Sequence, residues 1–162
     1  MTWLVDTSAL LSRWVLHAAR TCLAALGVVV IYGVVLRYAF NAAPPYVEQV
    51  ALLLVISVAM FGAAAGVHEA GHIGLDSVVK LLPAAGQRLV SVAVEVLILV
   101  FAALLLWGSA QMILSTYHDK IPTLGISEGW RYFPPVLASL LIALFSIVHL
   151  MALFKRGAGR WN

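Results

Sequence analysis

GAAAGVHEAGHIGLDSVVKLLP, residues 62–83, divides the chain into two long apolar parts. The beginning of this stretch consists of glycine and alanine, whereas its later part carries charged residues and histidines among apolar ones. Each flanking part contains two apolar runs close to the roughly 20 residues that a helix needs to cross a membrane. The stretch therefore predicts a connection between two membrane-spanning helical hairpins.

The composition of the chain is that of a membrane protein. Its 162 residues are 63% hydrophobic and 10% charged, and the mean hydropathy is +1.01. A soluble domain is about 45–50% apolar and about 25% charged, so this chain would be poorly solvated in water. Spans and short loops use nearly all of the length, which leaves no room for a soluble catalytic domain. The single cysteine, Cys22, excludes an internal disulfide and a cysteine metal cage.

We predict an all-α membrane protein with four transmembrane helices in one membrane domain, residues 1–162. Before the first span, apolar residues from Leu10 to Ala18 recur at helical spacing among polar ones, which is typical of a short interfacial amphipathic helix. A second such helix is predicted before Pro83. The four spans are expected at about 21–36, 47–66, 89–110 and 135–154.

The distribution of lysine and arginine predicts the orientation of the chain. Basic residues near span ends favour the cytoplasmic side, so both termini are expected in the cytoplasm. Because these residues are scattered over several span ends, the net charge of +3 does not indicate a nucleic-acid-binding patch. Seven of the ten share the side of the termini, namely Arg13, Arg20, Lys80, Arg88, Lys155, Arg156 and Arg160, and the other three are Arg37, Lys120 and Arg131.

The string His68-Glu69-Ala70-Gly71-His72 has the HExxH pattern of zinc enzymes. On a helix, His68 and His72 would lie one turn apart, and Glu69 would supply a base for a zinc-bound water. Asp76 continues this face, but it would lie about 12 Å along the helix axis from His68, too far to share one ion. We therefore favour the interpretation that these are polar residues at the membrane surface.

Haem binding is a second alternative that the histidines leave open. His17, His68, His72 and His149 are all expected toward the cytoplasmic side, where two of them from different helices would ligate haem b. Such a pair depends on spatial proximity, and histidines near span ends are more often interfacial. We expect no cofactor, and the alternative function is a small membrane haem-b or zinc (HExxH) enzyme subunit.

Glu95 is a carboxylate predicted inside a span, about two turns from Arg88. A charge within the membrane is costly and indicates either a function or a polar partner. We favour a hydrogen bond to a histidine, to Arg88 or to another subunit over a role in ion coupling. The small residues from Gly62 to Gly66 allow close helix packing in lipid, either inside the chain or against a partner.

Short motifs follow one another along nearly the whole chain. They are Arg37-Tyr38-x-Phe40-Asn41, Pro45-Tyr46-x-Glu48, His72-Ile73-x-x-Asp76, Leu82-Pro83 and a loop that runs from Lys120-Ile121-Pro122-Thr123 to Gly129-Trp130-x-Tyr132. This series resembles the small membrane subunit, of the DctQ type, of tripartite ATP-independent periplasmic (TRAP) transporters. Two departures are Gln49, where that family has the second of two paired glutamates, and His68-Glu69, where it commonly has arginines. The second departure creates the HExxH string, which favours an incidental origin for it.

The resemblance implies a non-enzymatic subunit of a secondary transporter in the bacterial inner membrane. Its expected partners are membrane lipids, a large multi-span permease with the substrate and sodium sites, and a periplasmic binding protein that delivers an organic acid. The small subunit would brace the static scaffold of the large one, and no catalytic residue or metal ligand is expected. The residues expected at the interface are Arg37, Asn41, Glu48, Gly62, Gly66, His72, Asp76 and Glu95.

The orientation is testable by cysteine labelling. We expect a cysteine placed in the first predicted periplasmic loop (Asn41→Cys, in a Cys22→Ser background) to react with a membrane-impermeant thiol reagent in intact cells. The extent of labelling is measured by gel shift before and after permeabilisation. Labelling that requires permeabilisation would show that the orientation is reversed.

Overall fold

The computed structural model describes residues 2–42, 44–70, 83–121, 125 and 127–158. The predicted short helix before Pro83, with His72 and Asp76, lies outside these residues. The prediction of an all-α protein with four helices able to cross a membrane is confirmed. The elements are α1 (Thr2–Ala39), α2 (Pro45–Ala70), α4 (Ala84–Thr116), the 3₁₀ helix η1 (Glu128–Tyr132) and α5 (Phe133–Ala158).

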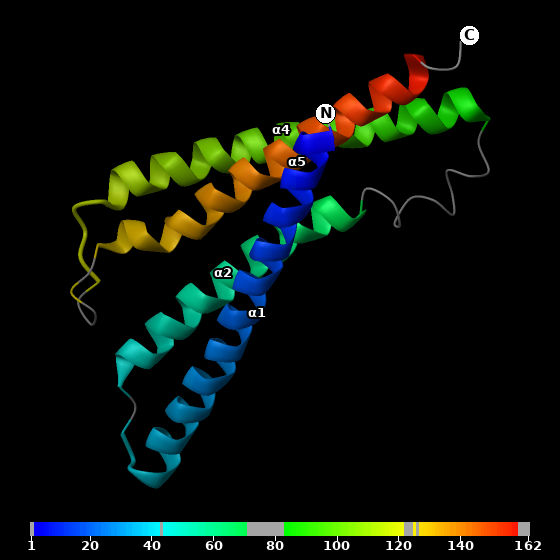
Figure 1. The fold of residues 1–162 in the computed structure, drawn as a ribbon. Coiled ribbons are helices and arrows are strands. Elements are labelled where there is room, and N and C mark those ends of the chain that lie inside the picture. Colours follow the sequence, from blue (N-terminus) through cyan, green and yellow to red (C-terminus); the bar gives the residue numbers. More distant parts are fainter. Residues whose placement is uncertain (1, 43, 71–82, 122–124, 126, 159–162) are drawn as a thin grey trace.

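The helices form two hairpins that cross each other at an angle (Figure 1). One hairpin consists of α1 and α2, and the other of α4 and α5. Helix α5 packs against both α4 and α2, and it also touches α1. Helix α5 is therefore the element that joins the second hairpin to the first.

Helix α1 continues without interruption from the N-terminal segment into the first span. A separate short interfacial helix around residues 10–18 was expected, but the structure has a single helix of 38 residues, about 57 Å long. No glycine or proline occurs between residues 2 and 26, so nothing in the sequence breaks the helix there. The N-terminal half of α1 also packs into the bundle, because Val15 belongs to the buried core.

The interior of the bundle contains mostly small side chains, and the large apolar side chains face outward. Ala64, Ala102 and Ala138 are almost completely buried, whereas Leu104 and Trp107 are largely exposed. Helices in lipid gain nothing from hiding large apolar side chains, and small residues allow their backbones to approach closely. In the part of the chain that the structure describes, the buried polar residues of this interior are Ser8, Ser12, Ser57, Glu95, Ser109, Ser139 and Ser146.

The connection between α1 and α2 is a tight turn. Asn41 has a positive φ of 49°, a conformation that asparagine tolerates better than most residues at a helix end. The amide of Ala42 donates to the carbonyl of Leu36 at 3.1 Å and closes the end of α1. Pro45 begins α2, where its missing amide hydrogen costs nothing. Asn41 thus has a backbone role in ending α1.

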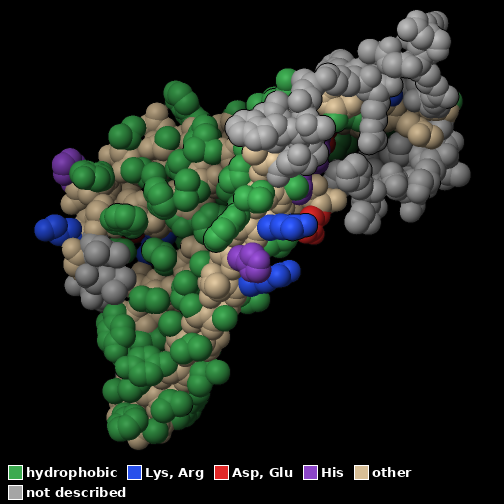
Figure 2. Space-filling view, viewed as in Figure 1, with side chains coloured by type: hydrophobic (Ala, Val, Ile, Leu, Met, Phe, Trp, Pro, Cys, Tyr) green, Lys and Arg blue, Asp and Glu red, His purple; other side chains and the backbone are tan. Residues whose placement is uncertain are grey.

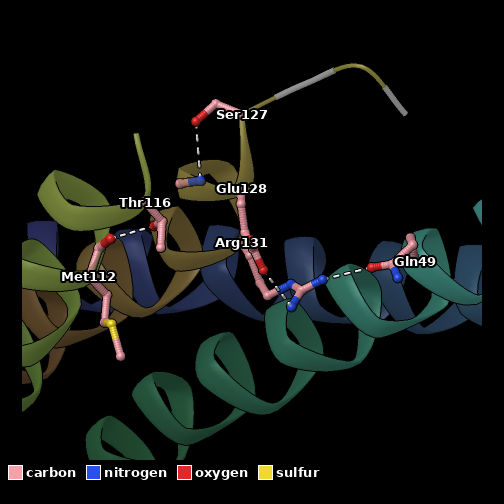
Figure 3. A network of polar contacts seen from close by, with 7 residues as sticks. Gln49, Met112, Thr116, Ser127, Glu128 and Arg131 are labelled. Carbon is pink, nitrogen blue, oxygen red and sulfur yellow. Dashed lines mark hydrogen bonds and ion pairs between the residues drawn. The ribbon is translucent and has the colours of Figure 1, made fainter. Parts of the chain in front are cut away.

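The segment after α4 folds back onto the end of that helix. The Ser127 hydroxyl donates to the Tyr117 carbonyl at 2.7 Å and accepts from the Gly129 amide at 3.2 Å. The Glu128 amide donates to the Asp119 carbonyl at 2.8 Å. Gly125 takes a φ of 67°, which glycine adopts without strain. These bonds orient η1 at the start of α5 (Figure 3).

Gly33 allows α1 and α2 to approach closely near the turn. A Cβ atom at this position would lie 2.8 Å from Cγ1 of Val47, so no larger residue fits without movement. Valine is branched at Cβ and cannot swing aside easily. By contrast, a Cβ atom at Gly27 on the same helix would meet nothing within 4 Å.

We expect Gly33→Ala to lower the unfolding free energy of the detergent-solubilised protein by about 1–3 kcal/mol, as overpacking does. Gly27→Ala is the matched control, and it should leave stability unchanged or raise it by up to about 1 kcal/mol through helix propensity. Val47→Ala combined with Gly33→Ala should restore part of the loss. Thermal or denaturant unfolding checks these values, and equal effects of the two alanine substitutions would contradict the close approach.

Candidate functional site

A cluster of polar side chains joins three helices inside the bundle. It consists of Glu95 on α4, Ser146 and His149 on α5, and His68 on α2, and we call it the interhelical cluster. Glu95 is 8% exposed and Ser146 is 1% exposed. Ser146 and His149 are three residues apart, which places both on the same face of α5.

Both oxygens of the Glu95 carboxylate lie close to side chains of α5. The Ser146 hydroxyl lies 2.7 Å from Oε2 and 2.9 Å from the Glu95 carbonyl oxygen, so its one hydrogen serves these two acceptors. The Nδ1 atom of His149 lies 3.2 Å from Oε1. Of the partners considered from the sequence, the structure therefore places a histidine against Glu95. The carboxylate connects α4 to α5 within the apolar bundle.

His68 extends the cluster to the first hairpin. Its ring centroid lies 4.8 Å from that of Phe145, which is completely buried, with an angle of 50° between the planes. Its ring is also nearly parallel to that of His149, with centroids 5.8 Å apart. Aromatic contacts at these distances are attractive. Helix α2 thus contacts α5 at His149, the residue that lies against Glu95.

The histidines of this cluster were candidates for zinc or haem. Among the described residues, no group of three histidine, cysteine, aspartate or glutamate side chains is arranged to hold a metal ion. His72, the second histidine of the HExxH string, lies outside those residues. His68 and His149 instead contact each other and the side chains of Phe145 and Glu95.

A second polar contact joins the two hairpins near the other end of the bundle (Figure 3). The guanidinium of Arg131 donates to Oε1 of Gln49 at 2.7 Å and to Oε1 of Glu128 at 3.2 Å. The fork of nitrogens lets one arginine bind both groups at once. In the sequence, Arg131 indicates only topology, and Gln49 is only a departure from a family pattern. Arg131 and Gln49 are 82 residues apart, so no local sequence pattern indicates that they form a pair.

The small residues at the end of α2 divide between two faces. Ala64 and Ala65 are buried in the bundle, whereas Gly62 is exposed and Gly66 is half-buried. A Cβ atom on either glycine would meet nothing within 4 Å. At 100° per residue the glycines share one face with three further residues. We call this the open α2 face: Leu52, Val55, Ala59, Gly62 and Gly66.

The residues expected at an interface do not form one group. Glu48 is exposed in the first turn of α2 and continues the open α2 face. Arg37 and Asn41 are exposed at the end of α1. Glu95 lies inside the bundle with its partners on α5. The described candidates thus occupy the helix ends, the surface of α2 and the interior.

Comparison with known proteins gives a consistent result. Residues 26–156 match the family described as tripartite ATP-independent periplasmic transporters, DctQ component. Two proteins of Haemophilus influenzae (strain Rd), both named provisionally as TRAP transporter small permease proteins, are similar to this chain. One is 28% identical over 130 residues, covering 80% of this chain and 81% of the relative. The other is 23% identical over 122 residues, covering 74% of each.

The cross-helix bond between Glu95 and Ser146 is testable by a double-mutant cycle in detergent. We expect Glu95→Ala and Ser146→Ala each to destabilise the protein, with a coupling energy of about 1 kcal/mol between them. Ser139 provides a matched control, because it is equally buried on α5 but donates to the Val136 carbonyl of its own helix at 2.8 Å. Coupling between Glu95 and Ser139 should be close to zero. Equal coupling in the two cycles would refute a specific bond.

Proposed function

This chain belongs to the DctQ component family of TRAP transporters, and we propose that it braces a large permease subunit in the membrane. It is a multi-pass protein of the bacterial inner membrane. The assembly that we propose takes up an organic acid delivered by a periplasmic binding protein, with sodium as the coupling ion. In it, this chain is non-enzymatic, and its termini are cytoplasmic.

The observation that best supports the bracing role is that Glu95 makes its contacts with residues of this same chain. A carboxylate that couples ion movement to transport lines a path that an ion or water can reach. In this chain both carboxylate oxygens are in contact with groups of α5, and the residue is buried. This intramembrane carboxyl group therefore holds helices together, which is what a static support requires.

Two connections between the hairpins support the same role. Arg131 binds Gln49 near the loop end of the bundle, and His68 packs on Phe145 and His149 toward the other end. Two separated contacts restrict rotation of one hairpin against the other more than a single contact does. A rigid small subunit is suited to hold the fixed part of a larger transporter while another part moves.

The open α2 face is the surface that we propose for the large permease. Partner helices in lipid are held by close packing and polar contacts, because lipid offers no hydrophobic drive for association. Gly62 and Gly66 expose backbone with free space in front of it. The buried alanines beside them already serve the packing within the chain.

We expect the chain to co-purify with a large permease subunit, and Gly62→Leu to reduce the recovered partner at least about fivefold. A leucine at this position fills the space that a neighbouring helix would occupy, while the fold of the chain has room for it. The yield of partner per tagged chain is measured by quantitative immunoblot. Uptake of the organic acid that the binding protein retains should fall in parallel.

Gly108→Leu is the matched control. Gly108 is exposed on α4, and a Cβ atom there also meets nothing within 4 Å. This variant should retain the partner if the large subunit docks on α2. Equal loss of partner in both variants would place the docking surface elsewhere. Uptake by this chain alone in proteoliposomes, at the rate of the complex, would refute the bracing role.

A further inference from the structure

The N-terminal half of α1 exposes a face that combines positive charge with apolar surface. The spacing of five exposed residues places them on one side of the helix. They are Leu10, Arg13, Trp14, His17 and Arg20. The first four line an open groove of about 300 Å³. Figure 2 shows basic and histidine side chains gathered over this part of α1, beside hydrophobic ones. We call this surface the basic α1 face.

The opposite side of the same helical segment is fixed in the bundle. Ser8, Ser12, Val15 and Ala19 are buried, and Val15 belongs to the core that includes residues of α2, α4 and α5. The two arginines are therefore carried on a helix whose position is set by packing. A ligand bound there would not have to order a loose tail, which lowers the entropic cost of binding.

The span predicted from the sequence, residues 21–36, places this face in the headgroup layer of a membrane. Residues 21–36 contain no charged residue, so Arg20 marks the boundary of the apolar span. Arg13 lies seven residues further out, which is about 10 Å along the helix axis. The polar layer of each leaflet is roughly 5–8 Å thick, since a bilayer measures about 40–45 Å with its headgroups and about 30 Å without them. With the span predicted from the sequence, residues 21–36, the phosphate groups of the lipids are expected between the levels of Arg20 and Arg13.

We propose that the basic α1 face binds the headgroup of an anionic phospholipid. The guanidinium groups of Arg13 and Arg20 are suited to phosphate oxygens, because arginine donates parallel hydrogen bonds to them. His17 lies between the two arginines and adds an N–H donor. Trp14 is 69% exposed and Leu10 is 61% exposed, and they offer an apolar wall to the glycerol and upper acyl chain.

This proposal does not depend on the large permease, because the groove is formed by α1 alone. A lipid fits better than a free phosphate ion, because the lining of the groove is almost entirely apolar. A free anion would leave this lining exposed to water. The joined polar and apolar surfaces match a molecule that carries a phosphate on an acyl chain.

Native mass spectrometry of the full chain in a neutral detergent tests the proposal. The chain is titrated with phosphatidylglycerol and, separately, with phosphatidylcholine of the same acyl chains, and the first dissociation constant is measured for each. We expect tighter binding of phosphatidylglycerol. Arg13→Gln combined with Arg20→Gln should weaken it on the order of tenfold and leave phosphatidylcholine unchanged. Arg13→Lys combined with Arg20→Lys keeps the charge, so it should weaken phosphatidylglycerol binding much less than the glutamine substitutions do.

Arg88→Gln combined with Lys120→Gln is the charge-matched control, since both residues are exposed and lie off the basic α1 face. It should bind phosphatidylglycerol as the wild type does, and circular dichroism should show equal helix content in all variants. Equal weakening in the control would overturn the proposal in favour of general charge attraction. Displacement of the lipid by millimolar inorganic phosphate would identify a free-anion site. Unchanged lipid binding with lost co-purification of the large permease would show that the face serves a protein partner.

Discussion

The contact of the Glu95 carboxylate with Ser146 and His149 determines how the second hairpin is assembled. A carboxylate inside a membrane bundle is costly unless each oxygen has a partner, and here both partners come from α5. This requirement fixes the rotation of α4 and α5 about their axes. The rotation of α5 in turn presents Phe145 and His149 to His68, so the first hairpin is positioned through the same residues.

The packing of the other side chains reflects the fact that lipid, and not water, surrounds the helices. Because lipid surrounds large apolar side chains as well as a protein interior does, the bundle places Leu104 and Trp107 outside and keeps alanine and serine inside. The hydroxyl groups of Ser57 and Ser109 donate hydrogen bonds to carbonyl oxygens of their own helices. Burial of these two serines therefore costs little free energy. Close helix packing without a large apolar core is consistent with a protein that assembles with other membrane subunits.

The exposed surface of the chain has two faces of different chemical character. The open α2 face is apolar and has free space in front of its glycines, so it suits another helix, whereas the basic α1 face carries two arginines that suit the headgroup we propose. Each surface lies opposite a packed side of its own helix, so neither is required for the fold of the chain. The bracing role that we propose would use separate contacts with the protein partner and with the bilayer.

The sequence alone determined the class of protein, its four helices, their pairing in hairpins and its family, because long apolar runs and ordered motifs are local in the chain. It did not determine that the N-terminal half of α1, which contains no helix-breaking residue, packs into the bundle through Ser8, Ser12 and Val15. Nor did it determine the partners of Glu95, the link from Arg131 to Gln49, or which small residues of α2 face inward. Helices that are apolar on all sides carry little sequence signal of which side faces the bundle. Only the tertiary structure decides that rotation, since polar groups inside the membrane must find one another across helices distant in sequence.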